Sequence, residues 1–433
     1  MIISRNIKNY LLYYMIIYIL NKNLWDHFLG SLSKGLYYGV LFVCAIGGVY
    51  KLIVRKESRR VVIFFLIYVA VVAINGLLIA NDEQRPVGFM EYLVYPLSFF
   101  AILFCMERKK DYRQIMTLYV YWAAITSILV MIEYIRKAPL ISSMENYEYH
   151  YYNGKSIITA YRPIAFIGSP MILAIFLGIG VLVCVYLSEF ENQKKTRVLI
   201  LIILIGILAT GSRAPLLSTV IGIAAMYYYK EKVGRGNRKF LIGCLIAIFG
   251  LLFLFVFTFV FPNFKTGISF IDTVYSRFAT TLDFKQEWGN VERLARWSYY
   301  LDRFVKNPVV GYGIASTSAA VASNTFATIH GVTTESGIIG RLVETGVVGC
   351  IPYYCMFFSA ISLSYRKLKA YAKNRVNSTF FLLIGTVILF LVEDAVLQVS
   401  LDIFATFVIW LFIAYAYNTA RHVATVNGKL DRK

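Results

Sequence analysis

Long apolar runs alternate with short polar segments along the whole chain. A helix that crosses the hydrocarbon core of a bilayer needs about 20 mostly apolar residues, and the runs predict twelve such helices. We place these spans at residues 9–21, 36–54, 61–80, 89–106, 115–135, 164–187, 198–209, 214–229, 240–261, 337–364, 378–394 and 401–420. The pattern is typical of an all-α, polytopic membrane helical bundle, and it predicts a single integral membrane domain over residues 1–433.

Residues 198–229 form an apolar stretch that is too long for one span. Thirty-two residues of α-helix would extend about 48 Å at 1.5 Å per residue, whereas the hydrocarbon core is about 30 Å thick. Thr210-Gly211-Ser212-Arg213 interrupts the stretch near its middle. The sequence therefore predicts a turn there, between two spans.

Positively charged residues orient the predicted bundle. Of the 44 Lys and Arg residues, 28 fall in the two termini and in five alternate loops, at 51–60, 107–114, 188–197, 230–239 and 365–377. Because cytoplasmic loops retain Lys and Arg, we expect both termini to be cytoplasmic. The loops at 136–163 and 262–336 then face outside, and the second of these is the large extracytoplasmic loop, after the ninth span.

Composition agrees with a membrane protein. Hydrophobic residues make up 58% of the chain and charged residues 16%, with a mean hydropathy of +0.63. Soluble chains carry about 45–50% apolar and about 25% charged residues, so a soluble protein is excluded. The formal net charge of +20 reflects the cytoplasmic loops, so we expect membrane lipids and no nucleic acid as partners. The six cysteines lie within apolar runs without metal-ligand spacing, and we expect neither a metal nor a cofactor.

Within the large loop, residues 290–306 have the pattern of an amphipathic helix in the outer membrane interface. Asn290 is placed to cap its start, and Asn307-Pro308 is placed to end it. Gly311 and Gly313 then allow the chain to turn sharply back toward the membrane. The apolar side is expected to contain Leu294, Trp297, Leu301, Phe304 and Val305, with Arg293 on the same turn as Trp297 and with Glu292, Arg296 and Arg303 elsewhere.

Two arginines lie where an ionisable side chain is costly. Arg213 sits at the predicted membrane-depth turn between two apolar helices, where a charge normally faces a polar cavity or a partner. Arg162 precedes a predicted span that Gly168-Ser169-Pro170 interrupts near the same surface. Either arginine could instead be an anchor that reaches the membrane surface. Their positions favour a polar site at the outer end of the bundle.

The segment that leads from the large loop into the next span is rich in titratable residues. His330 is the histidine of the large loop, and Glu335, Arg341 and Glu344 follow it. A single loop histidine is often uninvolved in chemistry, but three charges entering one helix predict a polar pocket at its outer end. The acidic pair at 393–394 forms either a similar group or part of a short external turn.

Four segments resemble motifs of bacterial O-antigen ligases and of O-antigen or capsule repeat-unit polymerases (Wzy/WaaL-like membrane glycosyltransferases). They occur in the family's order and cover roughly residues 155–360, whereas the first five spans resemble the family only in general character. The segments and the motifs that they resemble are Leu208–Ala214 (T-G-S-R-G/A), Arg293–Gly313 (R-L-x-x-W … P-L-x-G-x-G), Leu342–Gly349 (L-x-E-x-G-x-x-G) and, more loosely, Arg162–Pro170 (R-x-x-G-x-F-G-N-P).

This resemblance implies a glycosyltransferase of the bacterial cytoplasmic (inner) membrane, with its active site facing outside. The donor would be an oligosaccharide linked to undecaprenyl pyrophosphate, and an acceptor hydroxyl would attack the anomeric carbon. Arg213, Arg293 and, more weakly, Arg162 would bind the pyrophosphate, because guanidinium groups bind phosphate oxygens bidentately without a metal. Supporting roles would fall to Ser212, Trp297, Arg341 and Glu344.

The group that accepts the proton of the acceptor hydroxyl is open. Members of the family often carry H-N or H-S about nine residues before the closing glutamate, whereas this chain has Glu335-Ser336 there. Either Glu335 takes the position of that histidine, or His330 reaches the same space from the loop. Both are therefore candidate catalytic residues.

Three functions fit these observations. A polymerase would transfer growing glycan onto a new lipid-linked repeat unit in capsule, exopolysaccharide or O-antigen synthesis, with a flippase and a chain-length regulator as partners. A ligase would transfer finished glycan onto lipid A core or a protein. We favour the polymerase because the histidine position is altered. A transporter or flippase of lipid-linked saccharide is less favoured, because transporters tend to show repeat symmetry and the sequence contains no internal repeat.

Overall fold

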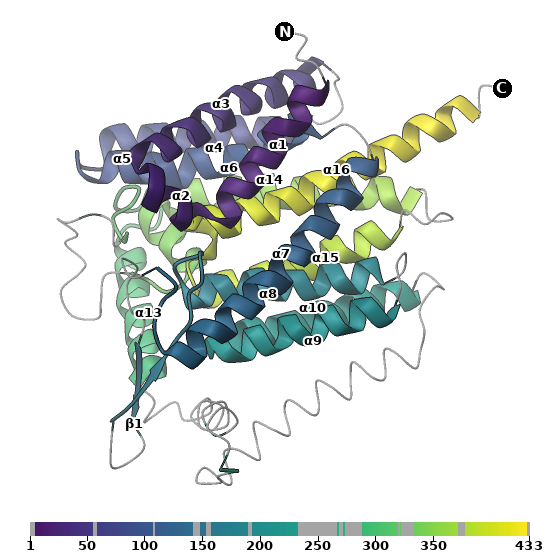
Figure 1. Cartoon of the computed structure of the whole chain (residues 1–433). Coiled ribbons are helices and arrows are strands. Elements are labelled where there is room, and N and C mark those ends of the chain that lie inside the picture. The colour runs from purple at the N-terminus through teal and green to yellow at the C-terminus, as the bar shows by residue number, and fades with distance from the viewer. Residues whose placement is uncertain are drawn as a thin grey trace. The chain divides into compact units, whose positions relative to one another are not determined.

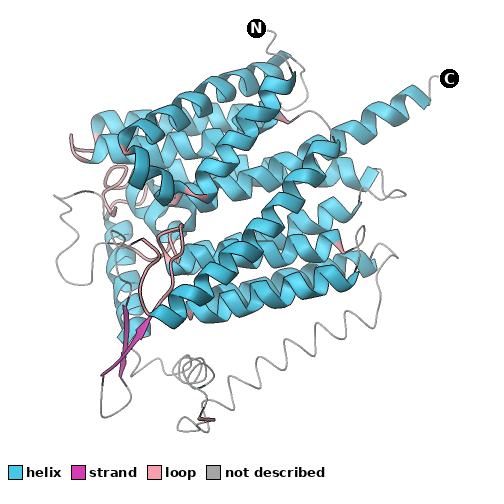
Figure 2. Ribbon diagram, in the orientation of Figure 1, coloured by secondary structure: helices cyan, strands magenta, loops and turns pink. Residues whose placement is uncertain are grey.

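The computed structural model is almost entirely helical over the part of the chain that it describes (Figures 1 and 2). That part comprises residues 5–54, 59–106, 109–141, 148–152, 157–188, 193–232, 266–267, 272, 288–318, 321, 333–370 and 377–430. Two compact units can be distinguished, and we describe each by itself. Unit 1 comprises Met1–Arg113, Ala295–Leu383 and Asp394–Lys433, and unit 2 comprises Gln114–Leu294 and Ile384–Glu393.

Unit 1 is built from paired apolar helices. Helix α3 packs along α6, α4 packs along α14, and α16 packs against both α6 and α14. Trp410 of α16 is fully buried, and its ring contacts Phe99 of α6 and Phe357 of α14. The elements that lie wholly or mainly in unit 1 are α1 (Arg5–Leu20), α2 (Lys22–Leu29), α3 (Ser31–Val54), α4 (Arg59–Leu78), α5 (Gln84–Phe89), the π-helical turn η1 (Met90–Val94), α6 (Tyr95–Cys105), α13 (Trp288–Lys306), α14 (Gly337–Ala370), the 3-10 turn η2 (Val399–Leu401) and α16 (Ile403–Leu430).

Unit 2 is built around α8 (Pro170–Leu187), against which α9 (Gln193–Thr210) and α10 (Arg213–Lys232) pack (Figure 1). Helix α8 is apolar on all sides, as expected of a helix surrounded by others, and 94% of its residues are buried. On α7 (Lys109–Arg136), the Tyr119 hydroxyl donates to the carbonyl of Phe176 on α8 at 3.1 Å. The unit also holds an antiparallel hairpin, β1 (Glu148–Tyr152) and β2 (Ile157–Tyr161), and part of α15 (Asn377–Val396).

The membrane prediction is confirmed in its general form. Described helices occupy the predicted spans, except that the span at 240–261 lies outside the described residues and the span at 164–187 is helical only from Pro170. Among the described residues, six helical segments are long and apolar enough to cross a membrane: Ser31–Val54, Arg60–Leu78, Gln84–Cys105, Arg113–Arg136, Pro170–Leu187 and Gly337–Leu363. The number of twelve spans, the single integral membrane domain and the external position of the large loop stay predictions.

Two local predictions are wrong, and one of the two alternatives for the acidic pair at 393–394 is excluded. Gly168-Ser169-Pro170 begins α8 rather than interrupting it, because the Ser169 hydroxyl accepts the N–H of Ile172 and proline suits the first helical turn, where no N–H is needed. Asn290 lies inside α13, which already begins at Trp288. The acidic pair at 393–394 lies within α15 and is buried, rather than forming an external turn.

The side of α13 predicted to be apolar is largely exposed, as a helix in the membrane interface requires, and its contact with the membrane stays a prediction. Leu294, Leu301 and Val305 are 49%, 42% and 72% exposed. Among the positions of α13 whose burial is described, Tyr300 is fully buried, and it packs with Val343 of α14. Hydrophobic spacing alone could not separate these two sides, because α13 carries apolar residues on both.

Candidate functional site

The predicted turn at 210–213 is confirmed, and it joins α9 to α10 in unit 2. Gly211 has a φ of 63°, a left-handed conformation that glycine adopts without steric cost. The Thr210 hydroxyl donates to the carbonyl of Ile207 at 2.7 Å and accepts the N–H of Ser212 at 3.2 Å. These bonds end α9 and place Arg213 at the start of α10.

Arg162 lies directly against this turn. Its Nε donates to the Thr210 carbonyl at 3.1 Å, and its Nη2 donates to the Ser212 hydroxyl at 2.7 Å. The same hydroxyl donates to the carbonyl of Pro170, the first residue of α8, at 3.3 Å. Arg162 is therefore bonded to the turn that Arg213 directly follows, and Ser212 links Arg162 to the start of α8.

The third predicted arginine, Arg293, belongs to the same unit and interacts electrostatically with Glu393 of α15. Glu393 is 1% exposed. Its Oε1 accepts a hydrogen bond from the hydroxyl of the buried Ser218, with 2.7 Å between the two oxygens. Ser218 lies on α10, the helix that begins at Arg213. Within unit 2, the hydrogen bond from Ser218 and the electrostatic interaction with Arg293 thus both involve Glu393.

Sequence reasoning missed the part that Glu393 plays in this arrangement. Its only signal was an acidic residue at the end of an apolar run, and that signal is shared with Asp394. Asp394 differs in its contacts, since its carboxylate accepts the N–H of Ser400 at 2.7 Å and the hydroxyl of Tyr354 at 3.0 Å, all within unit 1. Two adjacent carboxylates thus serve different parts of the structure.

The candidate bases are described only in part. His330 lies outside the described residues. Glu335, in unit 1, has a φ of 47° and forms an ion pair with Arg296 of α13, with 2.8 Å between Oε1 and Nη1. Trp297, the next residue on α13, has a buried indole Nε1 that has no hydrogen-bond partner among the described residues. Burial raises the pKa of the Tyr300 phenol on the same helix to about 12.

Glu344 anchors the loop that follows α13. It is fully buried, and its carboxylate accepts the backbone N–H groups of Ala315 (2.7 Å) and Thr317 (2.9 Å) and the Thr317 hydroxyl. Asn75 of α4 holds the same loop, because its side chain donates to the carbonyl of Val310 at 2.8 Å and accepts the N–H of Ile314 at 2.8 Å. Glu344 is therefore a structural support.

The segments that resemble the P-L-x-G-x-G and L-x-E-x-G-x-x-G motifs bind to each other through their backbones. Helix α14 is broken at Gly346, which has a φ of 60°, and the loop after α13 fills the break. A Cβ atom at Gly346 would overlap the Val309 carbonyl. The four bonds join Val347 N to Pro308 O (2.9 Å), Val348 N to Val309 O (3.2 Å), Tyr312 N to Val343 O (2.9 Å) and Gly313 N to Glu344 O (3.0 Å).

Arg341 is also structural. It is 1% exposed, and its guanidinium lies 3.6 Å from the ring centroid of Tyr353 and 4.7 Å from that of Tyr92. It donates to the Tyr68 hydroxyl at 3.0 Å and to the Ser400 hydroxyl and carbonyl at 3.2 and 2.9 Å. Arg341 and Glu344, two of the three charges predicted to line one polar pocket, thus serve the packing of unit 1.

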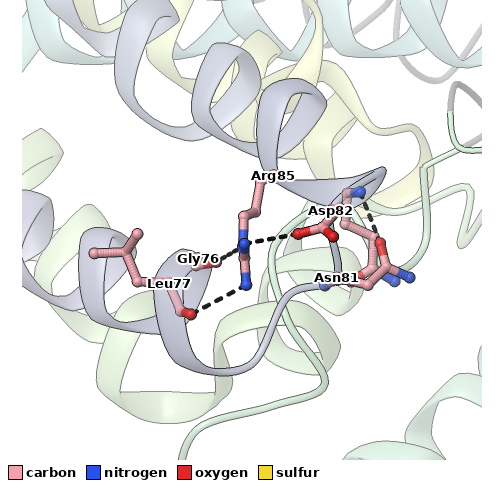
Figure 3. Close-up of polar contacts among 6 residues, drawn as sticks. Gly76, Leu77, Asn81, Asp82 and Arg85 are labelled. Atoms are coloured by element: carbon pink, nitrogen blue, oxygen red, sulfur yellow. Dashed lines mark hydrogen bonds and ion pairs between the residues drawn. The ribbon is translucent and has the colours of Figure 1, made fainter.

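A neighbouring turn in unit 1 holds the end of α4 in place (Figure 3). Arg85 donates from Nε to the Gly76 carbonyl at 2.9 Å and from Nη2 to the Leu77 carbonyl at 3.2 Å, and Nη1 pairs with Asp82 at 2.8 Å. The side chain of Asn81 accepts the N–H of the next helix at residue 84 (2.8 Å). Because α4 carries Asn75, this turn helps to fix the loop that follows α13.

Comparison with known proteins adds to this geometry. No curated protein matches the chain. Residues 198–354 match the family model described as O-antigen ligase, and the matched range begins in α9, contains the turn that bears Arg213 and ends in α14. The match supports the resemblance that the motifs suggested, and over this range the chain is similar to O-antigen ligases.

Proposed function

We propose that this protein is a metal-independent repeat-unit polymerase that takes its glycan from an undecaprenyl-pyrophosphate-linked donor at the outer face of the cytoplasmic membrane. The observation that carries the proposal is the pair of bonds from Arg162 to the turn that bears Arg213. The Arg162 guanidinium bonded to this turn, Arg213 as the residue that follows the turn, and Arg293 in the same unit together suit a diphosphate leaving group.

In this mechanism the acceptor hydroxyl attacks the anomeric carbon, and the bond to the lipid pyrophosphate breaks. Negative charge develops on the leaving diphosphate, and Arg213 and Arg293 stabilise it, with Arg162 as a weaker third group. The proton of the hydroxyl passes to His330 or to Glu335. If Glu335 is the base, it must first leave its ion pair with Arg296.

The second candidate function is a ligase that moves finished glycan onto lipid A core or a protein, and the description of the matched family supports it. Both functions use the same donor and the same arginines, and they differ only in the acceptor. We favour the polymerase because Glu335-Ser336 stands where ligases and polymerases often have a histidine.

The test uses the full-length protein in lipid nanodiscs with purified lipid-linked repeat units and no other acceptor. Polymerase activity lengthens the glycans, with release of undecaprenyl pyrophosphate, and continues in EDTA. Lengthening that stops without a divalent metal contradicts the metal-independent mechanism. Transfer only after lipid A core or an acceptor protein is added supports the ligase instead. Movement of unchanged donor across the bilayer contradicts both and supports a transporter.

The arginine assignment is tested in the same assay. We expect Arg213→Ala and Arg293→Ala to abolish product while the protein is still expressed and inserted, because the charge on the leaving group is no longer neutralised. Normal glycan length in both variants would refute the assignment. Variants His330→Ala and Glu335→Ala should show one severe and one mild loss, which identifies the base.

A further inference from the structure

Glu133 is a fully buried carboxylate in the last turn of α7 in unit 2. An ionisable group buried within an apolar helix is costly unless specific partners compensate it. The sequence shows it only as one acidic residue near the end of a predicted span, and the motifs shared with the ligase family do not include it.

The partners of Glu133 are backbone N–H groups from two places in the chain. Its Oε1 accepts the N–H of Leu140 at 2.8 Å, and its Oε2 accepts the N–H groups of Ile164 at 2.8 Å and Ala165 at 2.9 Å. One side chain therefore holds the beginning and the end of the segment that contains the β1–β2 hairpin. Hydrogen bonds to a charged acceptor are roughly twice as strong as those between neutral groups.

The end of this segment has a strained backbone that needs such support. Ala165 has a φ of 45°, a left-handed conformation that is unfavourable for a residue with a side chain. The N–H groups of Ile167 and Gly168 both bond to the Ile164 carbonyl, at 3.1 and 3.3 Å, which closes a tight turn before α8. The bond from Glu133 to the Ala165 N–H holds this turn at its strained residue.

Arg162 lies two residues before Ile164, between β2 and the held turn. Its guanidinium can bond Thr210 and Ser212 only while the backbone of Arg162 keeps its position relative to the start of α10. We infer that Glu133 is a positioning residue for Arg162: by fixing the backbone at Ile164 and Ala165, it keeps the guanidinium against the turn that bears Arg213. This inference rests on the proposed function, in which Arg162 contacts the diphosphate.

Glu133 does not act as the general base in this arrangement. Both of its carboxylate oxygens accept backbone N–H groups, and its side chain is fully buried, so an acceptor hydroxyl cannot approach it. Its effect on the reaction passes through Arg162. The substitution Glu133→Gln tests this, because the amide nitrogen would face backbone N–H groups that it cannot bond.

We expect Glu133→Gln to raise the KM for the lipid-linked donor about tenfold, with a smaller change in kcat, because the binding geometry of Arg162 is lost. In a double-mutant cycle, Arg162→Ala should raise the KM by a similar factor, and the double variant should be no worse than Arg162→Ala alone. Glu133→Asp keeps both oxygens and should raise the KM less than Glu133→Gln.

Ser127→Ala is the matched control. Ser127 is buried on the same helix, but its hydroxyl donates only within α7, to the Ala123 carbonyl at 3.0 Å. This variant should leave the donor KM unchanged. Should Glu133→Gln be poorly folded, as judged by thermal unfolding in detergent, the cycle is measured with Glu133→Asp.

The inference would be overturned if the increases in donor KM caused by Glu133→Gln and Arg162→Ala multiply in the double variant. It would also be overturned if Glu133→Gln lowers kcat and leaves the donor KM unchanged. Failure of the proposed function has a different signature. If Arg213→Ala and Arg293→Ala leave product formation unchanged, the diphosphate assignment fails whatever the cycle shows. If they abolish product while positions 133 and 162 are uncoupled, only the positioning role fails.

Discussion

At position 162, the geometry of the guanidinium matters as much as its charge. Arg162 uses two nitrogens for two separate acceptors, the Thr210 carbonyl and the Ser212 hydroxyl. A lysine ammonium is a point charge on a flexible stem and cannot reproduce this planar two-point contact. Because a hydrogen bond involving a charged group contributes about 1.5–3 kcal/mol, we expect Arg162→Lys to lower kcat/KM for the donor at least about tenfold. A donor titration in nanodiscs measures this, and a wild-type kcat/KM would contradict it.

Arg341 leads to the opposite expectation. It is buried against Tyr353 and bonds Tyr68 and Ser400, so its removal leaves polar groups of unit 1 without partners. We expect Arg341→Leu to lower the free energy of unfolding by about 3 kcal/mol. Reduced thermal stability in detergent measures this. By contrast, Arg213→Ala should keep wild-type stability and lose activity, and a stable but inactive Arg341→Leu protein would contradict the structural role.

Arg341 and Arg213 show what a sequence can reveal about single residues. A charge within an apolar run is visible in both cases, and for Arg341 it correctly indicates that the residue has polar surroundings. The run does not tell whether those surroundings are protein or substrate. Arg341 and Glu344 are supported by hydroxyls, rings and N–H groups from distant segments, which local patterns do not encode. Arg213 was distinguished by its turn and by the family motif.

Helix α14 depends on a break that only glycine permits. At Gly346 the backbone is left-handed, and a Cβ atom would overlap the Val309 carbonyl. We expect Gly346→Ala to destabilise the protein by about 3 kcal/mol or more, because it combines backbone strain with a steric overlap and weakens the bonds to the loop after α13. Thermal unfolding and expression level measure the effect.

Gly39→Ala is the matched control for Gly346→Ala. Gly39 lies within the helix α3, and a Cβ atom there would meet nothing within 4 Å. Replacing glycine by alanine in a helix interior removes a cost of about 0.5–1 kcal/mol, so this variant should be as stable as the wild type or slightly more so. Equal losses in both variants would show that the break at Gly346 is not what matters.

Elements were predictable where their cause is local. The turn at Gly211 followed from the length of an apolar stretch compared with the thickness of a bilayer, and the helix near 290–306 followed from its periodicity. The break in α14 and the buried side of α13 depend instead on contacts between segments far apart in the chain. The β1–β2 hairpin had no clear alternating pattern in the sequence, and one carboxylate on another element holds its ends.

On the scale of the whole molecule, the match to the ligase family covers residues 198–354 and includes parts of both compact units. The N-terminal helices α1 to α6 lie outside the match, yet α4 supplies Asn75 to the loop after α13. We conclude that these helices support the matched segments structurally. Their composition could predict apolar helices, but it could not predict this role, because one buried asparagine carries it.

The orientation in the membrane gives the last prediction. The distribution of Lys and Arg predicts that residues 107–114, with four Lys or Arg, are cytoplasmic and that the turn drawn in Figure 3 is outside. Fusions of alkaline phosphatase, which is active only outside the cytoplasm, after Asp82 and after Lys110 test this. We expect high activity after Asp82 and low activity after Lys110, because α5, η1 and α6 cross the membrane between these two points. A fluorescent protein fused after Lys433 should fluoresce, as it does in the cytoplasm. The reverse pattern would place Arg162 and Arg213 on the cytoplasmic side and would exclude a donor at the outer face.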